Sequence, residues 1–124
     1  RVAEAYLNAA EAEMHLNGEG SAKAKEYIDA LRHRAHAAVR PSYTLNDVLD
    51  ERSRELYCEG LRRTDLIRFN QFGGTQATYK WELKGGSTNG TTFTKTYNVY
   101  PLPSSEVRSN KNLTQIDGYN EVQN

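Results

Sequence analysis

The sequence has little cysteine, no excess of charge of either sign and no long apolar run. Cys58 is the only cysteine among 124 residues, which excludes an internal disulfide framework and a zinc site built from cysteines alone. The 16 basic and 16 acidic residues balance, so no overall field attracts nucleic acid or an anionic membrane surface. No segment reaches the ~20 apolar residues that a membrane-spanning helix needs. What remains is a small globular domain or a portion of a larger one.

The first residues are already in a helical pattern. No initiating Met and no Ser, Thr, Asp or Asn cap stands before the pattern that begins at Arg1 and Val2. We therefore expect the sequence to be part of a longer chain, with room upstream for a signal peptide or a lipid-bearing cysteine.

Two periodic segments predict an antiparallel helical hairpin over residues 1–39. Apolar residues recur at intervals of four, three and four in the first segment, and the second repeats this rhythm after a break at Asn17–Gly20. Ser21 is placed to cap the second helix. The hairpin's length and small residues are typical of a tetratricopeptide-like unit, whose period is about 34 residues. The expected buried positions are Ala3, Leu7, Ala10, Met14, Ala24, Ile28, Leu31, Ala35 and Ala38.

Residues 44–69 form the next helical region. Thr44 and Asp47 make a capping-box pattern, which predicts where this third helix begins. Gly60 interrupts the pattern, so the residues after it are expected to form another helical turn or two at a different angle. The expected buried side chains are Leu45, Leu49 and Leu56.

Acidic and basic residues alternate along residues 50–69 at the three- and four-residue spacings that bring side chains together on a helix. Glu55 and Glu59 would lie one turn apart, about 6 Å, which is near the carboxylate separation in a retaining glycosidase. The alternative is a structural network, because each carboxylate has an arginine within one turn that favours its ionised form. We favour the network, and expect no catalytic residue here.

The composition changes after residue 69, where Gly, Thr, Asn and Lys become frequent. Residues 79–83 and 92–97 alternate as strands do, on either side of a Gly-rich tip at 85–90. This arrangement predicts a short two-stranded β-ribbon. Residues 110–124 are expected to form an irregular tail.

The predicted fold class is therefore mainly α. It consists of a tetratricopeptide-like helical hairpin and a third helix, followed by a loop-rich segment with the short β-ribbon and the irregular tail. The expected organisation within 1–124 is a hairpin at 1–39, a helix at 44–69 and the loop-rich segment at 70–124.

Three patterns in the chain resemble those of one protein family, in the same order. They are Glu51-Arg52-x-Arg54-Glu55-Leu56-x-x-Glu59-Gly60-x-Arg62-x-x-Asp65-Leu66-x-Arg68-Phe69, then Tyr100-Pro101-Leu102-Pro103-x-x-Glu106-Val107, then Asn110-x-Asn112-Leu113-x-Gln115-x-x-Gly118-Tyr119. They resemble the signature helix and the two closing segments of the SusD/RagB family, although Leu56 and Phe69 stand where that family usually has an aromatic residue and often Trp. The opening hairpin resembles the helices just upstream, so that only residues 74–94 lack a counterpart.

The resemblance implies the carboxy-terminal region of a non-catalytic outer-membrane lipoprotein that binds oligosaccharides or polysaccharides for nutrient uptake. Its implied partner is a SusC-type TonB-dependent transporter, and its implied link to the cell surface is a lipid anchor upstream of this sequence. No cofactor and no nucleic-acid partner are implied. Sugar contacts in the family generally come from loops before this region, so most of the binding site is expected outside it.

Within the sequence, Trp81 and Tyr79 are the candidate sugar-binding residues. An exposed aromatic plane stacks on the apolar C–H face of a sugar ring, while neighbouring polar groups bind its hydroxyls. The alternative is that strand alternation turns one of the two rings inward as packing.

The sequence also raises the possibilities of a histidine metal site and of a protein-binding function. His33 and His36 stand three residues apart, which would begin a metal site on one helical face, but Arg32 and Arg34 disfavour a bound cation and no third ligand is evident. We expect a solvated face and no metal. The alternative function is a helical-repeat adaptor that binds protein rather than sugar, as the hairpin alone would suggest.

Overall fold

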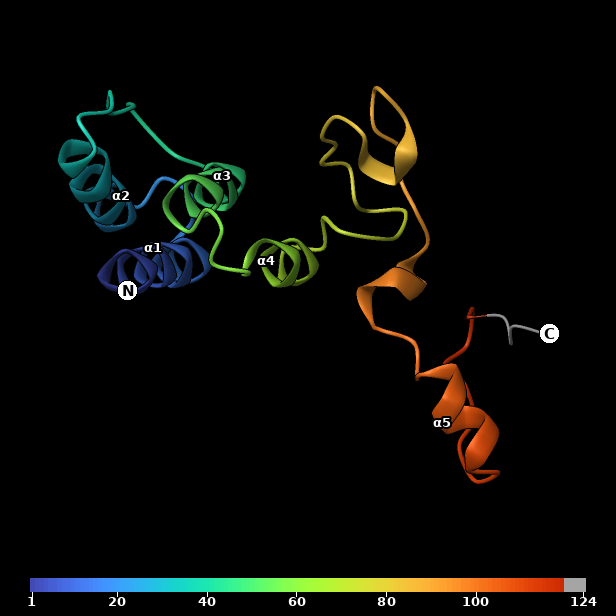
Figure 1. Cartoon of the computed structure of the whole chain (residues 1–124). Helices are drawn as coiled ribbons and strands as arrows, with labels where there is room; N and C mark the ends of the chain where they lie inside the picture. Colours follow the sequence, from blue (N-terminus) through green and yellow to red (C-terminus); the bar gives the residue numbers. More distant parts are fainter. Residues whose placement is uncertain (120–124) are drawn as a thin grey trace. The chain divides into compact units, whose positions relative to one another are not determined.

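The structure, a computed structural model, describes residues 1–119 (Figure 1). Over that range the chain has five α-helices, two short 3₁₀-helices and no strand. It divides into two compact units, Arg1–Asp65 (unit 1) and Leu66–Asn124 (unit 2). None of its described helices has both the length and the apolar character needed to span a bilayer.

Unit 1 opens with the expected hairpin, made of α1 (Val2–Asn17) and α2 (Ala22–Arg34), which pack against each other (Figure 1). The chain leaves α1 at Gly18, whose φ of 89° is open to glycine without steric cost. Ser21 caps α2 by accepting a hydrogen bond from the Ala24 amide at 3.3 Å, as predicted. The side chains between the helices are buried, at Ala3, Leu7, Ala10, Met14, Ala24, Ile28 and Leu31.

The hairpin is shorter than its periodicity suggests. The second helix ends at Arg34, and Ala35 and Ala38 are exposed rather than buried, so their prediction as core residues is wrong. The cause is local: His36 adopts φ 54°, a left-handed conformation that ends helical hydrogen bonding. The Arg32 side chain then binds the Ala38 carbonyl at 2.7 Å, which fixes the chain as it leaves the helix.

The third helix, α3 (Leu45–Glu55), packs on α1 (Figure 1). Its capping box is present, with the Thr44 hydroxyl accepting from the Asp47 amide and the Asp47 carboxylate accepting from the Thr44 amide at 2.8 Å. Val48, Leu49 and Leu56 are buried, whereas Leu45 is only half-buried. Each fully buried leucine contributes about 1.5–3 kcal/mol of hydrophobic stabilisation.

The helix ends five residues before Gly60. It ends at Glu55, and the chain turns through Cys58 (φ 61°) and Gly60 (φ 77°) before α4 (Arg62–Arg68) begins. Both positive φ values interrupt helical hydrogen bonding, so two separate helices replace one long helix with a bend.

Unit 2 contains the 3₁₀-helices η1 (Lys84–Gly86) and η2 (Lys95–Asn98) and the helix α5 (Ser104–Ser109). The short β-ribbon is not confirmed, because the residues expected to form it lie in loops, turns and η2 within the described chain. A strand needs continuous extended backbone, whereas Leu83 adopts a φ of 65° and residues 95–97 lie in η2. The segment therefore folds back on itself.

The later part of unit 2 is irregular and is held by side chains. The Gln115 amide pairs with both backbone groups of Leu102, accepting from its N–H and donating to its carbonyl, each at 2.9 Å. The Tyr119 hydroxyl donates to the Val99 carbonyl at 2.7 Å. The tail is thus irregular through residue 119, and the rest of the predicted tail, 120–124, lies outside the described residues.

Candidate functional site

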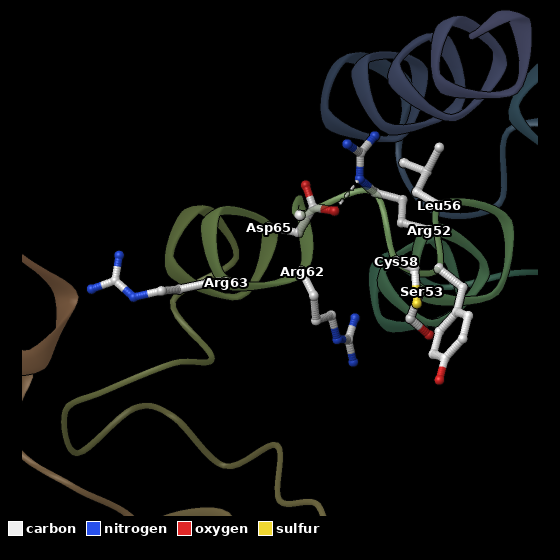
Figure 2. Close-up of a pocket in the computed structure, with 9 residues that line it drawn as sticks. Arg52, Ser53, Leu56, Cys58, Arg62, Arg63 and Asp65 are labelled. Atoms are coloured by element: carbon white, nitrogen blue, oxygen red, sulfur yellow. Dashed lines mark ion pairs between the residues drawn. The ribbon is translucent and has the colours of Figure 1, made fainter.

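The charged residues of α3 and α4 form ion pairs in the structure. Arg52 and Asp65 are buried together, with Nε and Oδ2 2.9 Å apart and side chains 4% and 6% exposed (Figure 2). The Arg52 guanidinium also donates to the Asn8 side-chain oxygen on α1 at 2.6 Å. A buried arginine that joins three helices in this way fixes their relative placement within unit 1.

The other carboxylates are also paired, but mostly with arginines from distant parts of the sequence. Glu51 accepts from Arg32 of α2 at 2.7 Å and from Arg54 at 2.6 Å. The latter is one of the predicted contacts within a single turn. Glu55 pairs with Arg34 of α2. Arg52, the arginine one turn before Glu55, instead faces Asp65.

This arrangement bears on the glycosidase interpretation. Because α3 ends at Glu55 and the chain then turns, Glu55 and Glu59 do not lie one turn apart on a common helix. Glu59 pairs with the Arg1 side chain, so each of the two has a guanidinium partner. Both carboxylates are therefore engaged in ion pairs, whereas the two carboxyl groups of a glycosidase flank the bond that they cleave.

A hollow of about 580 Å³ lies where α3 gives way to α4. Figure 2 shows Arg63 pointing away from the side on which Ser53 and Cys58 lie. Arg62 donates to the carbonyl of Leu49 in the middle of α3 at 2.8 Å, so its guanidinium contacts the side of that helix. The hollow is lined by Arg52, Ser53, Leu56, Tyr57, Cys58, Gly60, Arg62, Arg63 and Asp65. The side chains of Arg52, Arg62 and Arg63 point in different directions, so they do not form a joint binding site for an anion.

The two sequence-predicted site residues lie together in unit 2. Tyr79 and Trp81 are both half-buried, with ring centroids 6.5 Å apart and planes tilted by 47°. Their rings therefore form a bent aromatic pair with part of its surface exposed. Such a pair presents two apolar planes at different angles, which would suit successive sugar rings of a twisted oligosaccharide.

Lys84, which the sequence analysis did not single out, contacts both residues of this pair. The Lys84 side chain is 1% exposed, and its ammonium donates to the backbone carbonyls of Gln71 at 3.0 Å and Tyr79 at 2.8 Å. The same ammonium lies 4.6 Å from the centre of the Trp81 ring and 5.3 Å from that of Phe93. Burial lowers the pKa of Lys84 from its ordinary value of 10.5, and the nearby Lys80 charge lowers it further.

A series of aromatic rings continues from this point through unit 2. Phe72 meets Phe93 edge to face at 4.9 Å, Phe93 meets Tyr97 at 5.7 Å, and Tyr97 meets Tyr119 at 6.0 Å. Edge-to-face contacts of this kind contribute about 0.5–1.5 kcal/mol each beyond their buried area. They connect residues 72, 93, 97 and 119 through ring contacts within unit 2.

The two histidines do not share a helical face. His33 lies in the last turn of α2, and His36 lies beyond its end with a left-handed backbone. Both are exposed. Across residues 1–119, no group of three or more His, Cys, Asp or Glu side chains is arranged to hold a metal ion.

Comparison with known proteins places the fold and these motifs in a family. The sequence matches the profile of the SusD family over residues 1–119. The chain belongs to the SusD family. Solved structures of SusD-type proteins confirm the mainly helical fold of this member: a SusD superfamily protein from Parabacteroides distasonis superposes with a TM-score of 0.74 at 26% identity, covering 94% of this chain and 26% of that one.

Two named relatives of this SusD family member are binding proteins. Starch-binding protein SusD of Bacteroides thetaiotaomicron is 42% identical over 120 residues, which cover 96% of this chain and 21% of that protein. Surface glycan-binding protein A from Bacteroides uniformis has a TM-score of 0.72 at 32% identity, covering 93% of this chain and 26% of that one. The chain thus spans about a fifth of the length of the curated relative.

Proposed function

We propose that this SusD family chain belongs to a non-catalytic protein that binds glycans at the cell surface, and that Tyr79 and Trp81 contact the glycan. The observation that carries the proposal is the bent, half-exposed aromatic pair in a chain whose relatives are named for starch and glycan binding. The paired carboxylates of the α3–α4 region support a binding role rather than hydrolysis.

The physical basis is the match between the pair and a sugar ring. One face of a pyranose is covered by C–H groups, and it stacks on an aromatic plane with burial of apolar area on both partners. Two planes tilted by 47° would contact two successive sugar residues of a curved chain. Exposed amide and hydroxyl groups nearby, such as Asn89 and Thr91, are available to the sugar hydroxyls.

The test uses affinity electrophoresis of the protein, at its natural length, in gels containing soluble starch, pullulan, xylan or no polysaccharide. Trp81→Ala is expected to weaken binding to the retained polysaccharide about tenfold, equivalent to ~1.4 kcal/mol, and Tyr79→Ala by less. Tyr57→Ala is the matched control, because this tyrosine is 80% exposed and lies in unit 1. Equal affinities for Trp81→Ala and the control would contradict the assignment of these residues.

The finer part of the proposal concerns location and partner. As a SusD family member, the protein is proposed to be lipid-anchored at the outer membrane and to work beside a SusC-type TonB-dependent transporter. Purification of the tagged protein from outer membranes in mild detergent should then recover such a transporter. Recovery of the protein in the cytoplasmic fraction alone would overturn this part.

A protein-binding adaptor is the second candidate. The observation in its favour is that α1 exposes Val2 and Leu16, which are 73% and 81% accessible. Apolar side chains at the ends of a hairpin are typical of repeats that stack on neighbouring repeats. Capture of a defined polypeptide, together with no retardation in any polysaccharide gel, would favour the adaptor.

A further inference from the structure

Lys84 has an unusual place for a lysine, since its side chain is 1% exposed and it lies at the centre of the loop that carries Tyr79 and Trp81. We propose that Lys84 is a positioning residue that holds the Trp81 ring in the orientation needed for glycan contact. This inference rests on the proposed function of the Tyr79–Trp81 pair.

The ammonium connects the backbone of one aromatic residue to the ring of the other. It donates to the carbonyl of Tyr79 at 2.8 Å and faces the Trp81 ring at 4.6 Å, so the two residues on either side of Lys80 are tied to one charge. A third bond, to the Gln71 carbonyl at 3.0 Å, fixes the ammonium relative to the start of unit 2. The side-chain oxygen of Gln71 also accepts a hydrogen bond from the backbone amide of Tyr79 at 2.8 Å.

The backbone of Lys84 holds the segment from the other side. Its amide donates to the Trp81 carbonyl at 3.0 Å, and its carbonyl accepts from the Thr91 amide at 2.8 Å. Gly90 approaches so closely that a Cβ at that position would lie 2.4 Å from the Trp81 carbonyl oxygen. The main chain around Trp81 is therefore held by the backbone of Lys84 and by the close approach of Gly90.

The charge itself has a part in this arrangement. The polar contacts of the buried ammonium are backbone carbonyls and aromatic faces, and desolvation of such a charge has a free-energy cost that these contacts offset. An apolar residue would fill the same space without that cost, but it would neither bind the carbonyls nor attract the indole. Because the ammonium occupies one face of Trp81, a sugar would have to stack on the other face.

The experiment compares Lys84→Met, which keeps the length of the side chain, with Lys80→Met, which removes an exposed lysine four residues away. The first readout is the fluorescence of Trp81, isolated as the difference between each protein and its Trp81→Phe counterpart. The second readout is affinity for the polysaccharide that retards the natural protein in affinity electrophoresis. Lys84→Met should shift the Trp81 emission and weaken binding about tenfold, whereas Lys80→Met should change neither.

Lys84→Arg provides the rescue, because it restores a charge and several donors in the same place. It should recover part of the affinity and of the native emission, which an unspecific loss of packing would not allow. If Lys84→Met does not fold, as judged by circular dichroism and gel filtration, the Arg variant carries the comparison, and failure of both to fold would overturn a positioning role.

Two other results separate this inference from the proposed function. Unchanged Trp81 emission in Lys84→Met would overturn the positioning role even if Trp81 binds the glycan. A shifted emission in Lys84→Met, together with full affinity in Trp81→Phe and Trp81→Ala, would refute the glycan contact and with it the functional part of this inference.

Discussion

The buried pair of Arg52 and Asp65 gives a prediction that the structure makes quantitative. Asp65→Asn keeps the shape of the side chain but removes its charge, and so leaves a guanidinium that is 4% exposed without its counter-ion. Breaking a buried pair in this way costs about 3–5 kcal/mol, because the remaining charge cannot regain its hydration. Small domains have a total stability of about 5–15 kcal/mol, so the loss should be a large fraction of it.

The assay is urea unfolding followed by far-ultraviolet circular dichroism, with a double-mutant cycle of Arg52→Met, Asp65→Leu and the two together. Replacing both partners by apolar side chains should restore most of the stability, since no buried charge is then left. Asn8 loses its bond from Arg52, but it is exposed and binds water instead.

Arg40→Met is the matched control. The ion pair of Arg40 with Asp47 has side chains that are 52% and 22% exposed, so its loss should cost less than about 1 kcal/mol. A cost below about 1 kcal/mol for Asp65→Asn, or a double variant as unstable as the sum of its singles, would refute the reasoning.

Two more predictions concern unit 1. Thr44→Ala removes the hydroxyl half of the capping box of α3 and should lower the free energy of unfolding by about 1 kcal/mol in the same urea assay, with Thr44→Ser close to the natural protein. Burial raises the pKa of Asp29, but hydrogen bonds from Lys25 and Tyr43 outweigh it and the net pKa lies below the ordinary 3.8. The stabilisation from Asp29 is therefore complete above about pH 4 and is lost as the pH falls through its lowered pKa, so thermal melts should show a steeper acid loss for the natural protein than for Asp29→Asn.

Local signals in the sequence accounted for much of unit 1. The apolar spacing, the Ser21 cap and the Thr44–Asp47 capping box each depend on residues within a turn or two, and each is present in the structure. Such features are readable from sequence because the interacting groups are close along the chain.

The ends of the helices were less predictable because distant groups decide them. Nothing in the pattern from Glu55 to Glu59 opposes a helix, yet the chain turns there and Arg52 pairs with Asp65 on α4 instead of its neighbour Glu55. The burial of that pair depends on the packing of three helices, which a one-turn analysis of charges does not include.

The site showed the same limit. Tyr79 and Trp81 were found as aromatic candidates, but the burial of Lys84 could not be predicted, because lysines are mostly exposed and the hydrogen-bond partners of Lys84 are backbone carbonyls rather than side chains. The expected ribbon was missed for a related reason, since alternation of side chains does not reveal that Leu83 has a positive φ.

The turn that holds Cys58 offers an experimental handle. Its thiol is exposed and is the sole cysteine in the sequence, while the sole tryptophan is Trp81. One belongs to unit 1 and the other to unit 2. In a variant of the whole protein that keeps only this cysteine and this tryptophan, a fluorescent acceptor attached to the thiol would form an energy-transfer pair with the indole. Such a sample would report whether the spacing of the two units changes when polysaccharide is added.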